Sequence, residues 1–373
     1  MKRKVHFKYI LILLLPAGLL LNYISSLDRY ATERIYSNYI YKGIYKSISS
    51  ITGHIPVSVA EIIFILSVLM AIIYIINESI KFILHRAPRS AIIKNFVTNI
   101  LVFVGVGYFA FVIMWGMNYN RPPISETFEL EIIPASIEEL KGISEEIIQE
   151  VNTLRDKVME DERGIMYSEY GYKDVLDRAG TGFEVASETY QQIGTTNGTP
   201  KGILLSDFMS YTGIWGIYIP FTSEANVNTN IPAALLPHTI SHEMAHQIGF
   251  AREEEANYIA YLVCKNHPDI DFNYSGALFA TIHIINEIYH YSEDVYNDLM
   301  IELNEGVIRD MQEIRRFNKS YDGNIKQAFS DYNDLYLKVN GQKEGIISYR
   351  RVTDYIIADY RLKHEIVCQS EDR

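Results

Sequence analysis

The side chains best suited to chemistry in this chain of 373 residues lie in one short string, His242-Glu243-Met244-Ala245-His246. Histidines four positions apart share one face of a helix, so both imidazoles can bind the same metal ion. Glu243 lies beside the first histidine, where its carboxylate can take a proton from a water molecule activated at the metal. The string therefore predicts a Zn²⁺ site that hydrolyses a carbonyl compound, with His242 and His246 as ligands and Glu243 as the general base.

A zinc site of this kind needs a third protein ligand and one position that stays open to water. Glu253, Glu254 and Glu255 follow the second histidine, and a carboxylate from a second, antiparallel helix could supply that ligand. Acidic residues also suit the positive end of a helix, so one or two of the three are expected only to form a charged face.

His238 extends the row of histidines, because His238, His242 and His246 stand at positions i, i+4 and i+8. It could replace His246 as a ligand, but Glu243 would then lie beyond the ligand pair and lose its place beside the metal. We therefore expect His238 in the first turn of the helix, as a residue of the substrate cleft or of the shell around the ligands.

A substrate cleft is expected next to this helix. Residues 213–222 alternate, are rich in aromatic and β-branched side chains and contain a proline, which suits an edge strand or a position just past a strand end. The stretch from Tyr218 to Thr222 could be an edge to which an extended peptide adds its backbone, or a plain core strand. Further along, His283, Tyr289 or His290 could stabilise the oxyanion of a tetrahedral intermediate, or could be ordinary helix residues.

Helices are expected to position these residues. Apolar residues at helical spacing predict helices over residues 136–161, 182–192, 238–248 and 252–265, and a mostly helical chain from there to residue 363. Ser136 and Glu139 form a capping box at the start of the first of them. Gly249 ends the helix of the two histidines, and a turn there lets the chain fold back toward the metal.

The first part of the chain is predicted to cross a membrane. Three apolar segments approach the roughly 20 residues that a spanning helix needs, at about residues 9–24, 57–76 and 96–115. Lysines and arginines gather before the first segment and between the second and third, which predicts a cytoplasmic location for both places. Everything after Trp115 then faces outward. We expect a membrane domain over residues 1–120 and a soluble, extracytoplasmic domain over residues 121–373 of a multi-pass cell-membrane protein.

The net charge and the cysteines limit the partners and the metal ligands that we expect. A net charge of −12 argues against nonspecific binding to nucleic acid, so the expected partners are the lipid bilayer and a peptide or protein substrate. The two cysteines, Cys264 and Cys368, are far apart and fit no paired zinc-ligand spacing.

The metal-binding string and the helix after it resemble the gluzincins, in which an H-E-x-x-H helix and a glutamate on a following helix hold zinc. Glu253-x-x-Ala256-Asn257-x-x-Ala260 is similar to the E-x-x-A-D or E-x-x-A-N helix of membrane heat-shock gluzincins and of soluble peptidases that cleave phage-type repressors. The resemblance implies Glu253 as the third ligand and Asn257 as a residue that orients the site.

The spacing departs from that pattern. Only six residues separate His246 from Glu253, fewer than in those families, and the string up to Arg252 resembles the compact turn of the metzincins, although an arginine cannot be a ligand. The third ligand therefore stays open between Glu253 and Glu255.

Nearly the whole chain is also similar to a bacterial membrane family of unknown function. The similarity rests on the three apolar segments and on the strings at residues 115–119, 216–228, 242–262, 336–338, 341–342 and 345–349. Together the resemblances imply a mainly α fold, in which three N-terminal transmembrane helices precede an α+β zincin-like (gluzincin-like) domain with a small sheet.

Three functions are then compatible with the sequence. The first is a membrane-anchored, zinc-dependent metalloendopeptidase that cuts membrane or envelope proteins or peptides. The second is another zinc hydrolase, acting on cell-wall peptides. The third is a catalytically silent membrane receptor or assembly factor that retains a structural metal site.

Overall fold

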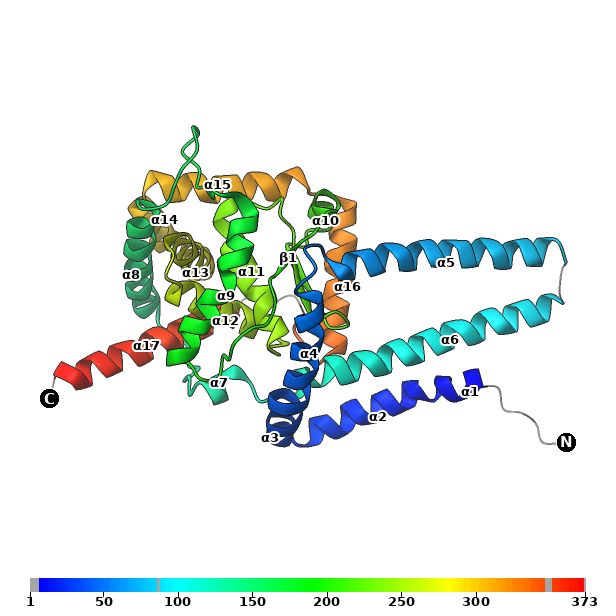
Figure 1. Cartoon of the computed structure of the whole chain (residues 1–373). Helices are drawn as coiled ribbons and strands as arrows, with labels where there is room; N and C mark the ends of the chain where they lie inside the picture. Colours follow the sequence, from blue (N-terminus) through cyan, green and yellow to red (C-terminus); the bar gives the residue numbers. More distant parts are fainter. Residues whose placement is uncertain (1–6, 86–87, 346–350, 372–373) are drawn as a thin grey trace.

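Three long helices leave one side of a helical domain (Figure 1). The computed structural model describes residues 7–85, 88–345 and 351–371, and the side chains up to residue 364. The three helices are α1–α2 (Phe7–Ile12 and Leu14–Leu27), α5 (Val59–Ile83) and α6 (Arg89–Met114), and each is long and apolar enough to cross a membrane. Each predicted segment falls on one of these helices, which we call the spans.

The ends of the spans lie on two sides. The start of α1, the end of α5 and the start of α6 lie far from the domain, whereas the end of α2, the start of α5 and the end of α6 lie next to it (Figure 1). The segment between the first two spans therefore stands on the same side as the domain, as three crossings require.

That inter-span segment is folded onto the domain. It forms α3 (Arg29–Ala31), the π-helical η1 (Thr32–Tyr41) and α4 (Lys42–Thr52), and a short helix η2 (Gly116–Asn120) follows the last span. Tyr41, Trp115 and Tyr218 belong to one buried aromatic cluster. Residues on both sides of the predicted domain boundary at residue 120 therefore pack into one hydrophobic cluster.

The domain itself is mainly helical. Its helices are α7 (Ile124–Thr127), α8 (Ile137–Arg155), α9 (Gly171–Thr189), α10 (Ser206–Thr212), η3 (Ala233–Leu235), α11 (Leu236–Gln247), α12 (Glu253–Asn266), α13 (Ile270–Tyr291), α14 (Glu293–Glu302), α15 (Glu305–Ser320), α16 (Asn324–Val339) and α17 (Val352–Glu371). Helices α11, α12 and α13 pack against one another in the centre, and α12 is buried along most of its length.

The predicted helices are present with shifted ends. Ser136 caps α8 as expected, since its Oγ accepts a hydrogen bond from the N–H of Glu139 at 3.1 Å. That helix stops at Arg155, before the predicted end, because the following chain turns back through a bridge between Glu160 and Met166. Helix α9 begins at Gly171, well before the expected start at residue 182.

A small sheet lies beside α11. Its strands are β1 (Lys201–Gly202), β2 (Gly216–Ile219) and β3 (Glu224–Val227), in the order β1-β3-β2. Strand β2 pairs antiparallel with β3 and has no strand on its other side among the described residues. Of the two alternatives for Tyr218 to Thr222, the edge strand is present in part: β2 includes Tyr218 and Ile219 and ends before Pro220, as a proline favours.

Candidate metal centre

Two helices bring three ligand atoms together. Helix α11 carries His242 and His246 one turn apart, and α12 begins with Glu253. The Nε2 atoms of His242 and His246 lie 3.2 Å and 3.5 Å from Oε2 of Glu253. All three ligand atoms lie within 4.8 Å of one another, so the group could hold a metal ion.

The tight turn between the helices explains the short spacing. Gly249 has a φ of +105°, a conformation that side chains with a Cβ rarely adopt. Its N–H donates to the carbonyl of His246 at 2.9 Å, and the N–H of Phe250 donates to the carbonyl of Ala245 at 3.2 Å. The chain reverses within these few residues, so that Glu253 faces the last turn of α11.

The protonation of His246 suits a metal ligand. Its Nδ1 lies 2.6 Å from the carbonyl oxygen of Phe250. A carbonyl can only accept, so Nδ1 carries a hydrogen, and Nε2 is the nitrogen that can bind a metal ion. Such a bond to the backbone is how proteins fix the tautomer of a metal-binding histidine. Nδ1 of His242 is buried, and the described residues give it no partner.

The charges around the group favour a cation. Burial raises the pKa of Glu253, but the adjacent imidazoles outweigh it and hold that pKa well below the usual range. Burial likewise lowers the pKa of His246, yet the Glu253 carboxylate dominates and raises it to about 9. Two imidazole nitrogens and a carboxylate oxygen this close need a positive charge among them. A proton or a divalent cation can supply it, and the donor set fits Zn²⁺.

Glu243 lies directly beside this group. Its side chain is buried, and its Oε2 atom has no hydrogen-bond partner among the described residues. Burial raises the pKa of Glu243 to about 7, partly offset by His242 and His246. A carboxylate with this pKa can both accept and return a proton near neutral pH.

Strand β2 runs past Glu243 at very close range. A Cβ on Gly216 would lie 2.7 Å from Cδ of Glu243, nearer than real Cβ contacts allow. A larger residue at this position would therefore displace the Glu243 side chain or the strand. A glycine inside a strand is the one feature of the sequence that indicates such a close approach, and the predicted site did not include Gly216.

The free edge of β2 presents backbone groups near Glu243. The N–H of Asn228 donates to the carbonyl of Trp215 at 2.8 Å, so these residues form a hydrogen-bonded pair of the ladder. Such pairs alternate along antiparallel strands, so Gly216 and Tyr218 turn their N–H and C=O groups away from β3. The backbone of Tyr218 lies near enough to lower the pKa of the Glu243 carboxyl.

The other two glutamates have different partners. Oε1 of Glu255 accepts from Arg252 at 2.6 Å and from the N–H of Ile124 at 2.9 Å. Oε2 of Glu254 accepts from Gln342 at 2.6 Å. Of the two candidates for the third ligand, the structure thus places Glu253 beside the imidazoles and directs Glu255 toward the chain after the last span.

The remaining candidates lie around the group. Asn257 is buried one turn after Glu253, and its backbone carbonyl is 3.4 Å from Nε2 of His238. His238 and His283 lie against Phe279, with ring centroids 3.7 Å and 4.3 Å away. Burial lowers the pKa of both histidines, that of His283 to about 4. Neither belongs to the described metal group, so the alternative ligand set with His238 is not formed.

Residues near the spans brace the histidine helix. The Tyr41 hydroxyl donates to the carbonyl of Gln247 at 2.9 Å and lies 3.0 Å from the Tyr218 hydroxyl. The Tyr218 side chain therefore contacts Tyr41 and does not extend along the free edge of β2. The Trp115 ring lies edge-on to the ring of His246, with centroids 5.8 Å apart. The sequence predicts Trp115 only as the end of the third apolar segment, and these contacts were not predicted.

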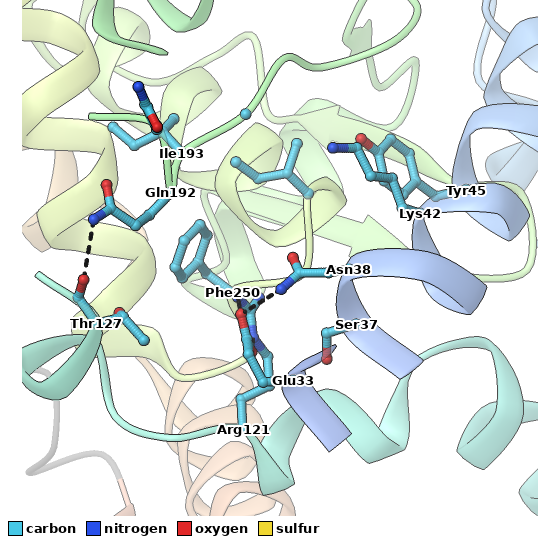
Figure 2. A pocket seen from close by; sticks show the side chains of 13 residues that line it. Glu33, Ser37, Asn38, Lys42, Tyr45, Arg121, Thr127, Gln192, Ile193 and Phe250 are labelled. Carbon is cyan, nitrogen blue, oxygen red and sulfur yellow. Dashed lines mark hydrogen bonds and ion pairs between the residues drawn. The ribbon is translucent and has the colours of Figure 1, made fainter. Parts of the chain in front are cut away.

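Arg121 holds the turn from the other side. Its guanidinium donates to the carbonyl of Gly249 at 2.7 Å, lies 4.8 Å from the ring centroid of Phe250 and pairs with Glu33. Arg121, Phe250 and Glu33 line a cavity of about 310 Å³ behind the turn, which Ile248 also lines (Figure 2). None of the three metal-group residues lines it, so this cavity is separate from the metal centre.

Comparison with known proteins gives a family and no activity. A family model described as a protein of unknown function (DUF3810) matches residues 36–357. The matched stretch contains the metal group, the β2 edge and the spans α5 and α6. No curated protein and no solved structure matches the chain.

Proposed function

The chain belongs to the DUF3810 family of proteins of unknown function, and we propose that it is a membrane-anchored, zinc-dependent metallopeptidase. One observation carries the proposal. Nε2 of His242, Nε2 of His246 and Oε2 of Glu253 converge within 4.8 Å, and the buried Glu243 carboxyl lies beside them under an edge strand. This combination supports hydrolysis more than a purely structural site, because a structural site needs no general base.

Each residue of the site would have a distinct role in hydrolysis. His242, His246 and Glu253 would hold the ion, which when bound supplies a Lewis acid that polarises a carbonyl and lowers the pKa of water toward ~7. Glu243 would take the proton from the attacking water and pass it to the leaving amine. Its pKa of about 7 suits both transfers.

A peptide substrate fits the free edge of β2. The outward N–H and C=O groups of Gly216 and Tyr218 can bind an extended backbone as an added strand. The same edge crosses Glu243, so a peptide on it would pass the base and the metal group. We therefore favour a peptide bond as the target. A zincin-like fold of the domain is part of the proposal.

The location of the site is also proposed. The spans and the basic residues at their far ends support a multi-pass protein whose domain faces outward. Its substrates would then be membrane or envelope proteins or peptides.

One purification of the full-length protein tests the function. Zinc per chain is measured first, and wild type and Glu243→Gln are then compared on casein and on peptidoglycan fragments. We expect one zinc in both proteins and turnover lower in the variant by about 10²–10⁴-fold. Zinc without turnover on any substrate would favour a silent receptor or assembly factor, and cleavage of peptidoglycan alone would favour a cell-wall hydrolase.

A further inference from the structure

Helix α16 carries an apolar stripe that the domain leaves uncovered. The stripe follows helical spacing and consists of Ile325, Phe329, Tyr332, Leu335 and Val339, all exposed. Within the helix only Leu337 is buried. A helix that buries so little in its own domain and shows a continuous apolar stripe is typical of an interface with another molecule or with lipid.

A second group of exposed apolar side chains lies on α10 and just before it, and α10 packs against α16. Leu204, Leu205 and Phe208 are exposed to 74%, 45% and 58%. We call the α16 stripe and these three residues together the α10–α16 patch. So much apolar surface in one place is uncommon on the water-facing side of a soluble domain.

The α10 part of the patch is attached to a span. The N–H groups of Leu204 and Leu205 donate to the Glu61 carboxylate at 2.9 Å and 2.8 Å. Glu61 is the third residue of α5, so both leucines lie level with the first turn of that span. The Glu224 carboxylate accepts from the N–H groups of Val59 and Ala60 at 3.1 Å and 2.8 Å, which joins the start of the span to β3.

The α16 part is attached near a second span. The Tyr119 hydroxyl donates to the Tyr336 hydroxyl at 3.2 Å, and Tyr119 follows the last residue of α6, Met114, by five positions. Figure 1 shows α16 on the side from which the spans leave, running across their direction. Both parts of the patch therefore stand at the depth where spans enter the domain.

We propose that the α10–α16 patch lies in the surface of the bilayer that the protein's own spans cross. The 25 residues of α5 extend about 37 Å, more than the ~30 Å hydrocarbon core, so its first turn reaches the headgroup region. Leucine, phenylalanine and tyrosine side chains at that depth are stabilised by contact with the upper acyl chains.

Spin labels on the full-length protein in phosphatidylcholine–phosphatidylglycerol vesicles test the proposal. Cys368→Ser removes one native thiol, and the thiol of Cys264 is buried and does not react in the folded protein. Single cysteines then replace Tyr332, Leu335 and Phe208. Two matched controls are Lys338, on the polar side of α16, and Ile301 of α14, which is apolar and 82% exposed but outside the patch.

The readout is collision of each label with oxygen, which concentrates in lipid, and with a water-soluble nickel complex. We expect oxygen to exceed nickel several-fold at the three patch positions and nickel to exceed oxygen at both controls. Water-like values at the patch would overturn the proposal. So would protection from both reagents, which means that protein covers the patch; spin–spin broadening between labelled copies would then identify a second copy as the cover.

Discussion

At the scale of single residues, the centre depends on which side chain neutralises which charge. Glu253 faces two imidazoles, whereas Glu255, two positions later, faces Arg252 and the N–H of Ile124. The two carboxylates are close in sequence but point to different parts of the molecule. This separates binding of metal from attachment of the domain to the chain after the last span.

Substitution of the two glutamates should therefore give opposite results. Glu253→Gln removes a charged ligand and should lower zinc affinity by about 10²-fold or more. Glu255→Gln should retain zinc but lower the free energy of unfolding by about 2 kcal/mol, because Arg252 loses its buried partner. Zinc titration and thermal unfolding of each variant check this. Loss of zinc from Glu255→Gln alone would reverse the ligand assignment.

Zinc affinity should depend on pH. Burial disfavours a charge on His246, but Glu253 raises its pKa to about 9, so the metal-free site holds a proton at neutral pH. Because zinc must displace that proton, the affinity of the site for zinc should rise with pH and level off above about pH 9. Calorimetry at about pH 7 in buffers of different ionisation enthalpy should show about one proton released per zinc from this pair. An affinity unchanged between about pH 7 and 9 would contradict the assigned proton.

At the scale of elements, α11, α12 and β2 are the three that make the site. Gly216 allows β2 to pass over Glu243, and Gly249 allows α12 to begin against the last turn of α11. Glu243, the metal group and the proposed substrate edge are then held by regular structure, which fixes their positions better than loops would.

Enlarging Gly216 should separate chemistry from metal binding. In Gly216→Val the new side chain must push Glu243 or the strand aside, since even its Cβ would lie 2.7 Å from Cδ of Glu243. We expect zinc content close to wild type and peptidase activity lower by at least about 10²-fold. Ile217→Val, on the same strand with an exposed side chain, is the matched control and should keep both. Equal activity in the two variants would remove β2 from the site.

Sequence could predict those elements because their signals are local. The spacing of the histidines, Gly249 and the following glutamates predicted α11 and α12. The alternation of apolar and polar residues predicted β2. The inter-span segment has no such signal: Tyr36 and Tyr41 face the core five positions apart, an interval that suits the wider turn of the π-helical η1 and not the α-helical period. Contacts between residues far apart in sequence, such as Tyr41 with Gln247, leave no pattern in a single sequence.

At the scale of the whole molecule, membrane part and domain form one unit. Trp115 follows the last residue of α6 and touches His246, and Arg121 holds the turn that leads to Glu253. The candidate metal group thus lies against the end of α6, and the chain beside the spans forms part of its surroundings.

Removing the first 120 residues should consequently damage the centre. A fragment of residues 121–373 loses Tyr41 and Trp115 and exposes the cluster face around Tyr218. We expect it to aggregate or to bind zinc at least about tenfold more weakly than the full chain. Coexpression with residues 1–120 should restore binding in the copurified complex. A monomeric fragment with full zinc affinity and peptidase activity would show that the membrane part is only an anchor.

The most direct test of the central claim is X-ray absorption at the zinc edge on the full-length protein loaded with one equivalent of zinc. We predict two imidazole ligands, with further nitrogen or oxygen donors at about 2.0–2.2 Å and no sulfur, and the loss of one imidazole in His246→Ala. A spectrum that is the same in wild type and in His246→Ala, or a wild-type protein that retains no zinc, would contradict the account.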